Sequence, residues 1–159
     1  YGAGIAKALG IDLEEALKLN PSQTEAYLMR GQIFNLSGIT FFTFGGAYSP
    51  DRAYREEGIS WFPEELPSRQ EYLEGWENLK KSGFKVDYIL THTAPQNIIS
   101  KMGYKDLSVH NEEAPLREFL QQVADHTDFK AWYFGHFHKD CKIADSYFCL
   151  YDILSLIQR

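Results

Sequence analysis

The residues best suited to chemistry in this sequence are three histidines, each placed just after a predicted β-strand. His92 follows the apolar run 84–91, and His136 and His138 follow the shorter run 131–134. A helix is predicted between the two runs. If the two strands run parallel, this strand-helix-strand order brings their carboxyl ends to one edge of a sheet, where ligands of open α/β sheets bind. We therefore expect the three imidazoles to converge.

Converging imidazoles without a cysteine pair indicate a borderline divalent metal such as Zn, Fe, Mn, Co or Ni. Gly135 lets the backbone bend as it leaves the sheet, and the His-x-His alternation sends both rings of the pair to one side. A single histidine behind a buried strand is more often a hydrogen-bonded structural residue, so the coincidence of His92 with the pair is what favours ligation. For His110 and His126, in a loop and at a helix end, solvated or capping roles are expected.

The hydrophobic pattern predicts the elements that position these histidines, within one compact domain. The expected elements, in chain order, are an amphipathic helix at 5–19, a β-hairpin at 33–44, a helix at 70–81, a strand at 84–91, a helix at 115–124, a strand at 131–134 and a hairpin at 142–151. Between the first hairpin and the second helix, the segment 47–69 has no sustained period and mixes aromatic with charged residues. Loops this long usually form lids or binding loops.

Composition excludes several classes of protein. The 159 residues carry a formal net charge of −6 and a sequence pI near 5.3, so broad binding to nucleic acid is not indicated. No apolar run is long enough to span a membrane, and the first 20 residues lack a signal-peptide layout, which favours a cytoplasmic protein. Two cysteines, Cys141 and Cys149, are too few for a disulfide framework, and two buried free thiols are favoured over a bond across the terminal hairpin.

Two short motifs carry a resemblance to a known family. The Thr-His-x-x-Pro sequence at 91–95 and the Gly-His-x-His sequence at 135–138 resemble the last two motifs of the calcineurin-like metallophosphoesterases. The stretch 41–51 looks like small bacterial and phage members of that superfamily. The similarity implies that residues 27–159 are the carboxyl-terminal part of a metallophosphoesterase domain, and that 1–26 form a helical amino-terminal segment unlike the family.

The resemblance implies a hydrolase with a dinuclear manganese, iron or zinc site, in which metal-activated water attacks phosphate monoesters or diesters. By analogy, His92 and His136 bind one metal and His138 binds the other. The Gly45-Gly46 turn lets a ligand approach the backbone at Gly46. In the following loop, Arg52 and Arg55 have the planar guanidinium that pairs with a substrate phosphate, although a surface ion pair is the commoner role.

The sequence also departs from the family. The complete pattern has Asp-x-His, Gly-Asp-x-x-Asp and Gly-Asn-His motifs upstream, and none occurs here. The expected fold is therefore an α/β (α+β) fold, a partial calcineurin-like sandwich with a mixed β-sheet, flanking helices and missing amino-terminal strands. We expect one metal ion or none, a truncated and inactive enzyme as one outcome, and a sheet edge that favours homo-oligomers.

Two other functions stay open at this stage. The first is a noncatalytic metal-binding or protein-interaction module that retains the phosphoesterase fold, with its partner on the 47–69 loop. The second is a mononuclear zinc enzyme with three histidine ligands, which the close fit of the motifs to the family pattern disfavours.

Overall fold

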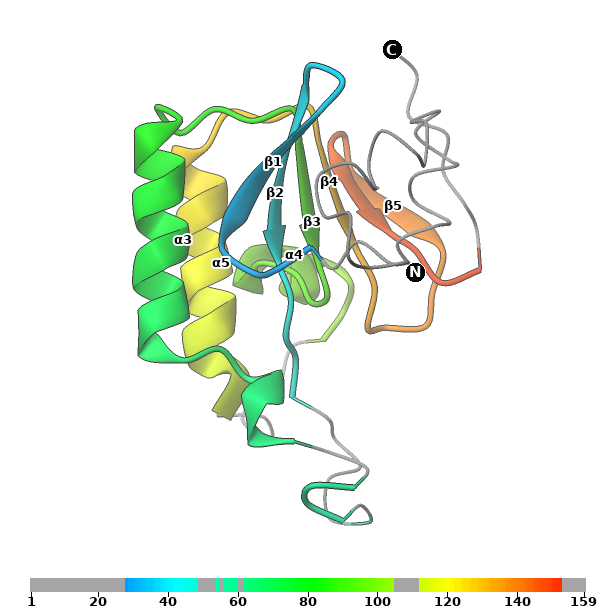
Figure 1. The fold of residues 1–159 in the computed structure, drawn as a ribbon. Coiled ribbons are helices and arrows are strands. Elements are labelled where there is room, and N and C mark those ends of the chain that lie inside the picture. The colour runs from blue at the N-terminus through cyan, green and yellow to red at the C-terminus, as the bar shows by residue number, and fades with distance from the viewer. Residues whose placement is uncertain (1–27, 49–53, 55, 60–61, 105–111, 153–159) are drawn as a thin grey trace.

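The computed structural model describes residues 28–48, 54, 56–59, 62–104 and 112–152 (Figure 1). The elements in chain order are β1 (Gln32–Leu36), β2 (Ile39–Phe44), the short 3-10 helix η2 (Pro63–Glu65), α3 (Arg69–Lys81), β3 (Tyr88–Thr91), α4 (Gln96–Lys101), α5 (Ala114–His126), β4 (Ala131–Phe134), β5 (Cys141–Ala144) and β6 (Tyr147–Cys149). Several expectations lie outside the described residues: the segment 1–26 with its helix at 5–19, and the residues Arg52, Arg55 and His110.

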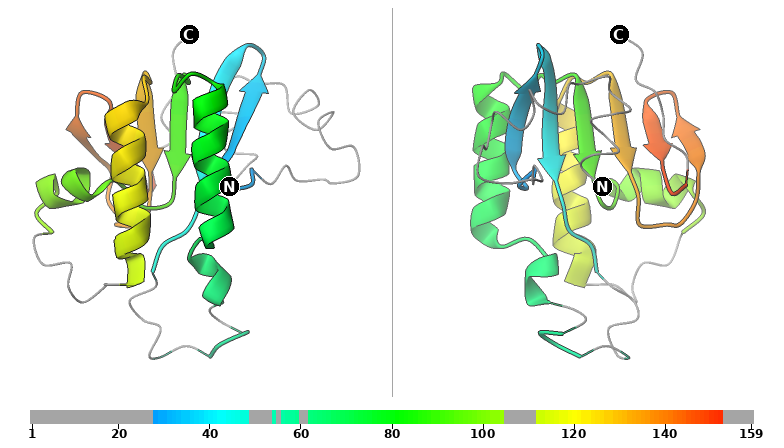
Figure 2. Two further views of the ribbon diagram at one scale, coloured as in Figure 1. Left: turned by 90° about the vertical axis from the view of Figure 1, so that its left-hand side faces the viewer. Right: turned by 45° about the vertical axis from the view of Figure 1, so that its right-hand side comes forward.

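The strands form one six-stranded mixed sheet in the order β1-β2-β3-β4-β6-β5. The four central strands, β2, β3, β4 and β6, run parallel to one another, whereas β1 and β5 pair antiparallel at the two edges. The carboxyl ends of the four parallel strands therefore meet at a single edge of the sheet, toward which the arrows of β2, β3 and β4 point in the right-hand view of Figure 2. The predicted mixed sheet with flanking helices is confirmed.

Helices α3 and α5 lie side by side on one face of this sheet (Figure 2). The core between them is aromatic: the ring centroid of Phe44 lies 4.6 Å from that of Phe119, which lies 5.1 Å from that of Tyr72. Removing this apolar surface from water is the main stabilising contribution, at roughly 25 cal/mol per Å². Among the described residues, no helix is both long and apolar enough to cross a lipid bilayer.

The opposite face of the sheet is also apolar. A second buried cluster contains Phe41, Tyr88 and Ala131, from three neighbouring strands. The rings of Phe41 and Tyr88 stack with centroids 5.4 Å apart, and those of Tyr133 and Phe148 stack at 5.2 Å. The central strands thus bury side chains on both faces, as their near-continuous apolar runs predict.

Three local predictions need correction. Only the last half of the run 84–91 is a strand, because Phe84 has a φ of +53° and belongs to the turn after α3. The helix α4 was not predicted, since six residues are too few for a hydrophobic period. Cys141 and Cys149 do face each other across the hairpin as free thiols, but Cys141 is exposed.

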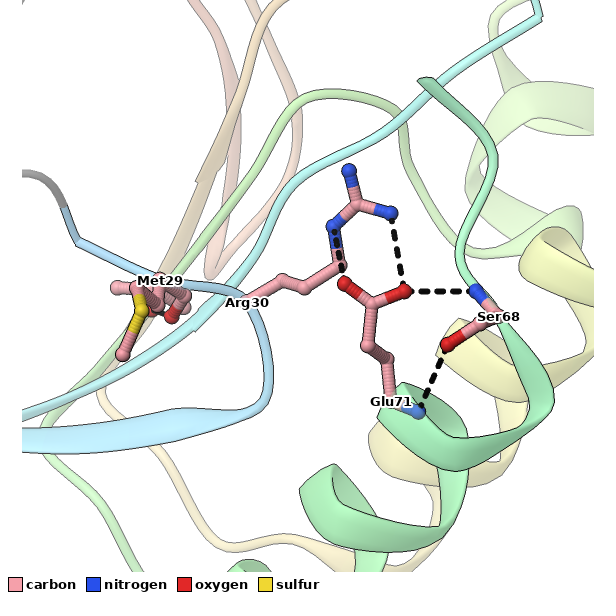
Figure 3. Close-up of polar contacts among 5 residues, drawn as sticks. Met29, Arg30, Ser68 and Glu71 are labelled. Atoms are coloured by element: carbon pink, nitrogen blue, oxygen red, sulfur yellow. Dashed lines mark hydrogen bonds and ion pairs between the residues drawn. The ribbon is translucent and has the colours of Figure 1, made fainter. Parts of the chain in front are cut away.

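A polar network fixes the start of α3 against the chain that enters β1 (Figure 3). Ser68 and Glu71 form a capping box, in which Ser68 N donates to Glu71 Oε2 at 2.7 Å and Glu71 N donates to Ser68 Oγ at 3.3 Å. Arg30 pairs with the same carboxylate at 3.4 and 3.5 Å. Beside it, the Thr43 hydroxyl donates to the Met29 carbonyl at 2.7 Å. The Arg30–Glu71 pair therefore joins the helix start to the chain that enters β1, and the Thr43–Met29 bond joins that chain to β2.

The contact between the first hairpin and α3 depends on a glycine. A Cβ atom on Gly75 would lie 3.0 Å from Phe44 Cε2 and 3.2 Å from Gly31 Cα. We predict that Gly75→Ala lowers the free energy of unfolding by about 1 to 2 kcal/mol, because overpacking exceeds the gain in helix propensity. Urea denaturation measures it. Glu77→Ala, on the exposed side of α3, is the control, and an equal or higher stability for Gly75→Ala would contradict the prediction.

At the amino edge of the sheet, Asp87 joins three strands. Its carboxylate accepts hydrogen bonds from the backbone N and the hydroxyl of Thr40 at 2.8 and 2.9 Å, and pairs with Lys130 Nζ at 2.8 Å. The bond from Lys130, followed by those from Thr40, lowers the pKa of Asp87 from 3.8 to about 2. A depressed carboxyl pKa stabilises the folded state above the unfolded pKa, and this stabilisation is lost as pH falls through the folded value.

We therefore predict that Asp87→Asn loses less stability than the wild type as the pH falls from about 4 to about 2. Urea unfolding midpoints across that interval measure the effect. The control is Asp145→Asn, at an exposed aspartate in the turn between β5 and β6. An unchanged pH dependence in Asp87→Asn would show that the network does not act through this carboxylate.

Candidate functional site

The carboxyl edge of the sheet brings two of the three predicted histidines together. β3 ends at Thr91 and β4 ends at Phe134, and the segments that follow are joined by a backbone hydrogen bond from Gly135 N to the His92 carbonyl at 3.0 Å. The rings of His92 and His136 have centroids 5.2 Å apart and an interplanar angle of 64°. Convergence of this pair was predicted from strand order, and the structure shows it.

The backbone that carries the Gly-His-x-His motif has an unusual conformation. His136 has a φ of +70° and His138 a φ of +49°, both in the left-handed region that residues other than glycine seldom adopt. Such residues are unfavourable by about 1 to 3 kcal/mol each and are concentrated at functional sites. Phe137 N donates to the Gly135 carbonyl at 2.9 Å and closes the turn between them. The two histidines therefore lie in a strained turn.

His138 has a different ring partner from the other two histidines. Its ring stacks on Tyr151 with centroids 4.8 Å apart and planes at 19°, and both residues are exposed. Asp140 holds the partner in place, because its carboxylate accepts from Tyr151 N at 2.7 Å and from Asp152 N at 3.1 Å. Alternation places both rings of a His-x-His pair on one side only in extended backbone, and here both histidines are in the left-handed region.

The surroundings of His92 favour the neutral form of its imidazole. Burial of the ring, although part of the residue is open to solvent, lowers its pKa from the ordinary 6.5, and the nearby charge of His138 acts in the same direction. The carboxylates of Glu113 and Glu65 act in the opposite direction but have the smaller effect. A neutral imidazole has one nitrogen lone pair free for a metal ion or a proton.

The separation of the two rings can be compared with that of two histidine ligands on one cation. A metal bound to imidazole nitrogen at about 2.0 to 2.1 Å, with ring centres about 1 Å farther out, places two tetrahedral ligands with centroids about 5 Å apart. The observed 5.2 Å agrees with this value. Within the described part of the chain, however, no group of three or more His, Cys, Asp or Glu side chains is arranged to hold a metal ion. This separation is shared by two ligands on one cation and by an edge-to-face ring contact, and a full set of ligands is not assembled there among the described residues.

Gly46, at the end of β2, approaches the protein's own backbone. It has a φ of +118°, and a Cβ atom on it would lie 2.6 Å from the Glu65 carbonyl oxygen. Gly45, in contrast, has no atom within 4 Å of such a Cβ. Of the two glycines, Gly45 is the one with open space beside it, and Gly46 fixes the path of the chain toward α3. Whether Gly46 contacts a ligand stays a prediction.

Sequence reasoning missed a buried ion pair close to this edge. Glu113 and Arg117 have side chains only 6% and 4% exposed, and Arg117 Nη1 donates to Glu113 Oε2 at 3.0 Å. Tyr48 N, in the segment after β2, donates to Glu113 Oε1 at 3.1 Å. Glu113, just before the predicted helix 115–124, and Arg117 within it have the spacing of an ion pair, but the sequence does not show that this pair is buried.

Comparisons of the chain with family models, with curated proteins and with solved structures find no match. The resemblance to the metallophosphoesterases therefore rests on its short motifs alone. The structural observation beside it is the meeting of His92 and His136 at the carboxyl edge of four parallel strands.

The two adjacent glycines provide a matched pair of variants. We predict that Gly46→Ala lowers the free energy of unfolding by about 1 to 3 kcal/mol, because the new Cβ meets a backbone oxygen and the positive φ is strained for alanine. Gly45→Ala should change it by less than about 0.5 kcal/mol. Thermal or urea denaturation of both proteins measures the difference. Equal stabilities would mean that the 45–48 segment does not follow this path.

Proposed function

We propose that this chain binds a divalent manganese, iron or zinc ion through His92 and His136, and that its chemistry is hydrolysis of phosphate monoesters or diesters by metal-activated water. The observation that carries the proposal is the 5.2 Å separation of the two rings, which come from segments 44 residues apart in the chain (136 − 92). The short motifs around these residues supply the reaction class.

The residues at the edge suit this role. The lowered pKa of His92 favours the neutral ring, which is the form that binds a metal ion. A bound divalent ion would supply positive charge to the phosphoryl oxygens and acidify a water molecule. The four parallel strands place the pair where ligands of such sheets bind.

His138 remains available as a further ligand in this proposal. Its stacking partner Tyr151 covers a face of the ring, whereas the lone pair of the unprotonated nitrogen lies in the plane of the ring. The contact therefore orients the imidazole without consuming a nitrogen. The family analogy assigns His138 to a second metal, and we retain this as part of the proposal.

A second function is favoured by a different observation. The acidic motifs of the complete family pattern are absent from the sequence, and the described residues include no cluster of three metal-binding side chains. A noncatalytic metal-binding or protein-interaction module that retains the fold does not need these motifs, and it is the second candidate. Both candidate functions include metal binding, and only the first includes hydrolysis of a phosphate ester.

The metal is tested first. We predict that His92→Ala and His136→Ala each weaken Co²⁺ or Zn²⁺ binding by at least about tenfold, since second-shell losses alone reach that size. Titration of the purified chain, followed by calorimetry or by the visible spectrum of bound Co²⁺, measures it. The control is His126→Ala, because His126 lies at the end of α5 with its Nδ1 against the Gln122 carbonyl. Equal affinity in all four proteins would overturn the proposal.

Turnover separates the two functions. Hydrolysis of a generic aryl phosphate in the presence of Mn²⁺ or Zn²⁺, lost when a chelator is added and lost in His136→Ala, is the result expected of the phosphoesterase. Metal binding by the wild-type chain with no hydrolysis above that of the free metal ion would overturn the phosphoesterase assignment and leave the binding module.

A further inference from the structure

We infer that the buried Glu113–Arg117 pair is a positioning device for the candidate site, which fixes the segments leaving β2 and β3 so that His92 lies against His136. The inference rests on the proposed function only for its chemical consequence, metal affinity. The positional part concerns the protein without metal and can be tested separately.

The pair joins the segments that leave two neighbouring parallel strands. Glu113 accepts from the backbone of Tyr48, four residues after the end of β2. Arg117 Nε donates to Gln96 Oε1 at 2.9 Å, and Gln96 is the first residue of α4, which follows β3. A second bond, from Asn97 N to Gln121 Oε1 at 3.0 Å, fixes the same end of α4 to α5.

The connection from α4 back to His92 is short and rigidly packed. Only Thr93, Ala94 and Pro95 separate His92 from α4, and all three are buried. The carbonyl of His92 in turn accepts from Gly135 N, directly before His136. A displacement of Gln96 is therefore expected to move His92 through this short buried segment. The bond from Gly135 N to the His92 carbonyl would then change the position of His136.

Stability alone does not explain why the pair is buried. Two charges removed from water lose hydration free energy that their attraction seldom exceeds, and well-packed apolar replacements of buried pairs are often neutral or stabilising. Such a pair instead makes hydrogen bonds of fixed geometry. One oxygen of Glu113 accepts from Tyr48 N and the other accepts from Arg117, whose guanidinium also donates to Gln96 at the start of α4. The bonds to Tyr48 and Gln96 are directional contacts of this kind.

The test is the double variant E113M/R117M, which puts unbranched apolar side chains at both positions and removes both charges together. The matched control is E118M/Q122M, with the same spacing on the exposed face of α5. In metal-free protein, we expect the nuclear Overhauser effect between the rings of His92 and His136 to be strong in the wild type and the control and lost in E113M/R117M. We expect the melting temperature of E113M/R117M to stay within about 4 °C of that of the wild type.

Co²⁺ titration of the same three proteins gives the chemical consequence, with an expected loss of affinity of about tenfold and an altered visible spectrum in E113M/R117M only. An unchanged ring contact in E113M/R117M would overturn the inference, whatever the metal does. If the wild type binds no Co²⁺, the proposed function fails, and the ring contact still decides the role of the pair. Should E113M/R117M not fold, E113Q and R117K take its place, and an unchanged ring contact in both would overturn the inference.

Discussion

The arrangement of the candidate site depends on the parallel pairing of β3 with β4. Tyr88 pairs with Ala131 and Leu90 with Tyr133, so that the two strands end at the same level of the sheet. The bond from Gly135 N to the His92 carbonyl continues this pairing past the last strand residues. Without this register, two histidines from distant parts of the chain would not face each other. The chemistry proposed for the protein is therefore a consequence of strand register.

The rest of the structure maintains that register from both ends. At the amino edge, Asp87 bonds to Thr40 and Lys130, which fixes β2, β3 and β4 relative to one another. Within the sheet, the indole N–H of Trp132 in β4 donates to the hydroxyl of Thr91 at 2.8 Å. Thr91 is the last residue of β3 and immediately precedes His92. At the carboxyl edge, the Glu113–Arg117 pair holds the exits of β2 and β3. Polar contacts at three levels thus act on strands whose faces are otherwise apolar.

Much of this could be predicted from the sequence because the signals are local. The turn at Ser37 and Gly38, both with positive φ, lies between two apolar runs, and the prediction of a hairpin there is confirmed. The apolar stripe and the Ser-Gly stop give α3 almost residue for residue. The convergence of His92 with His136 could be predicted because it depends on the order and direction of the strands, not on any particular side-chain contact.

What the sequence could not provide are contacts that depend on tertiary packing. The stacking of His138 on Tyr151 follows from left-handed residues that a binary pattern does not encode. The burial of Glu113 and Arg117 requires knowledge of which helix face meets α4. The approach of Gly46 to the Glu65 carbonyl depends on the path of a loop without periodicity. In each case the deciding partner is distant in the chain or lies in an irregular segment.

The central claim is that His92 and His136 share one cation. X-ray absorption spectroscopy of the Zn²⁺-loaded chain tests it most directly, because imidazole ligands give characteristic multiple scattering from zinc. A shared cation predicts at least two imidazole nitrogens at about 2.0 to 2.1 Å from the zinc, with one fewer in His92→Ala and in His136→Ala. A spectrum without imidazole scattering, or one that neither substitution changes, would contradict it.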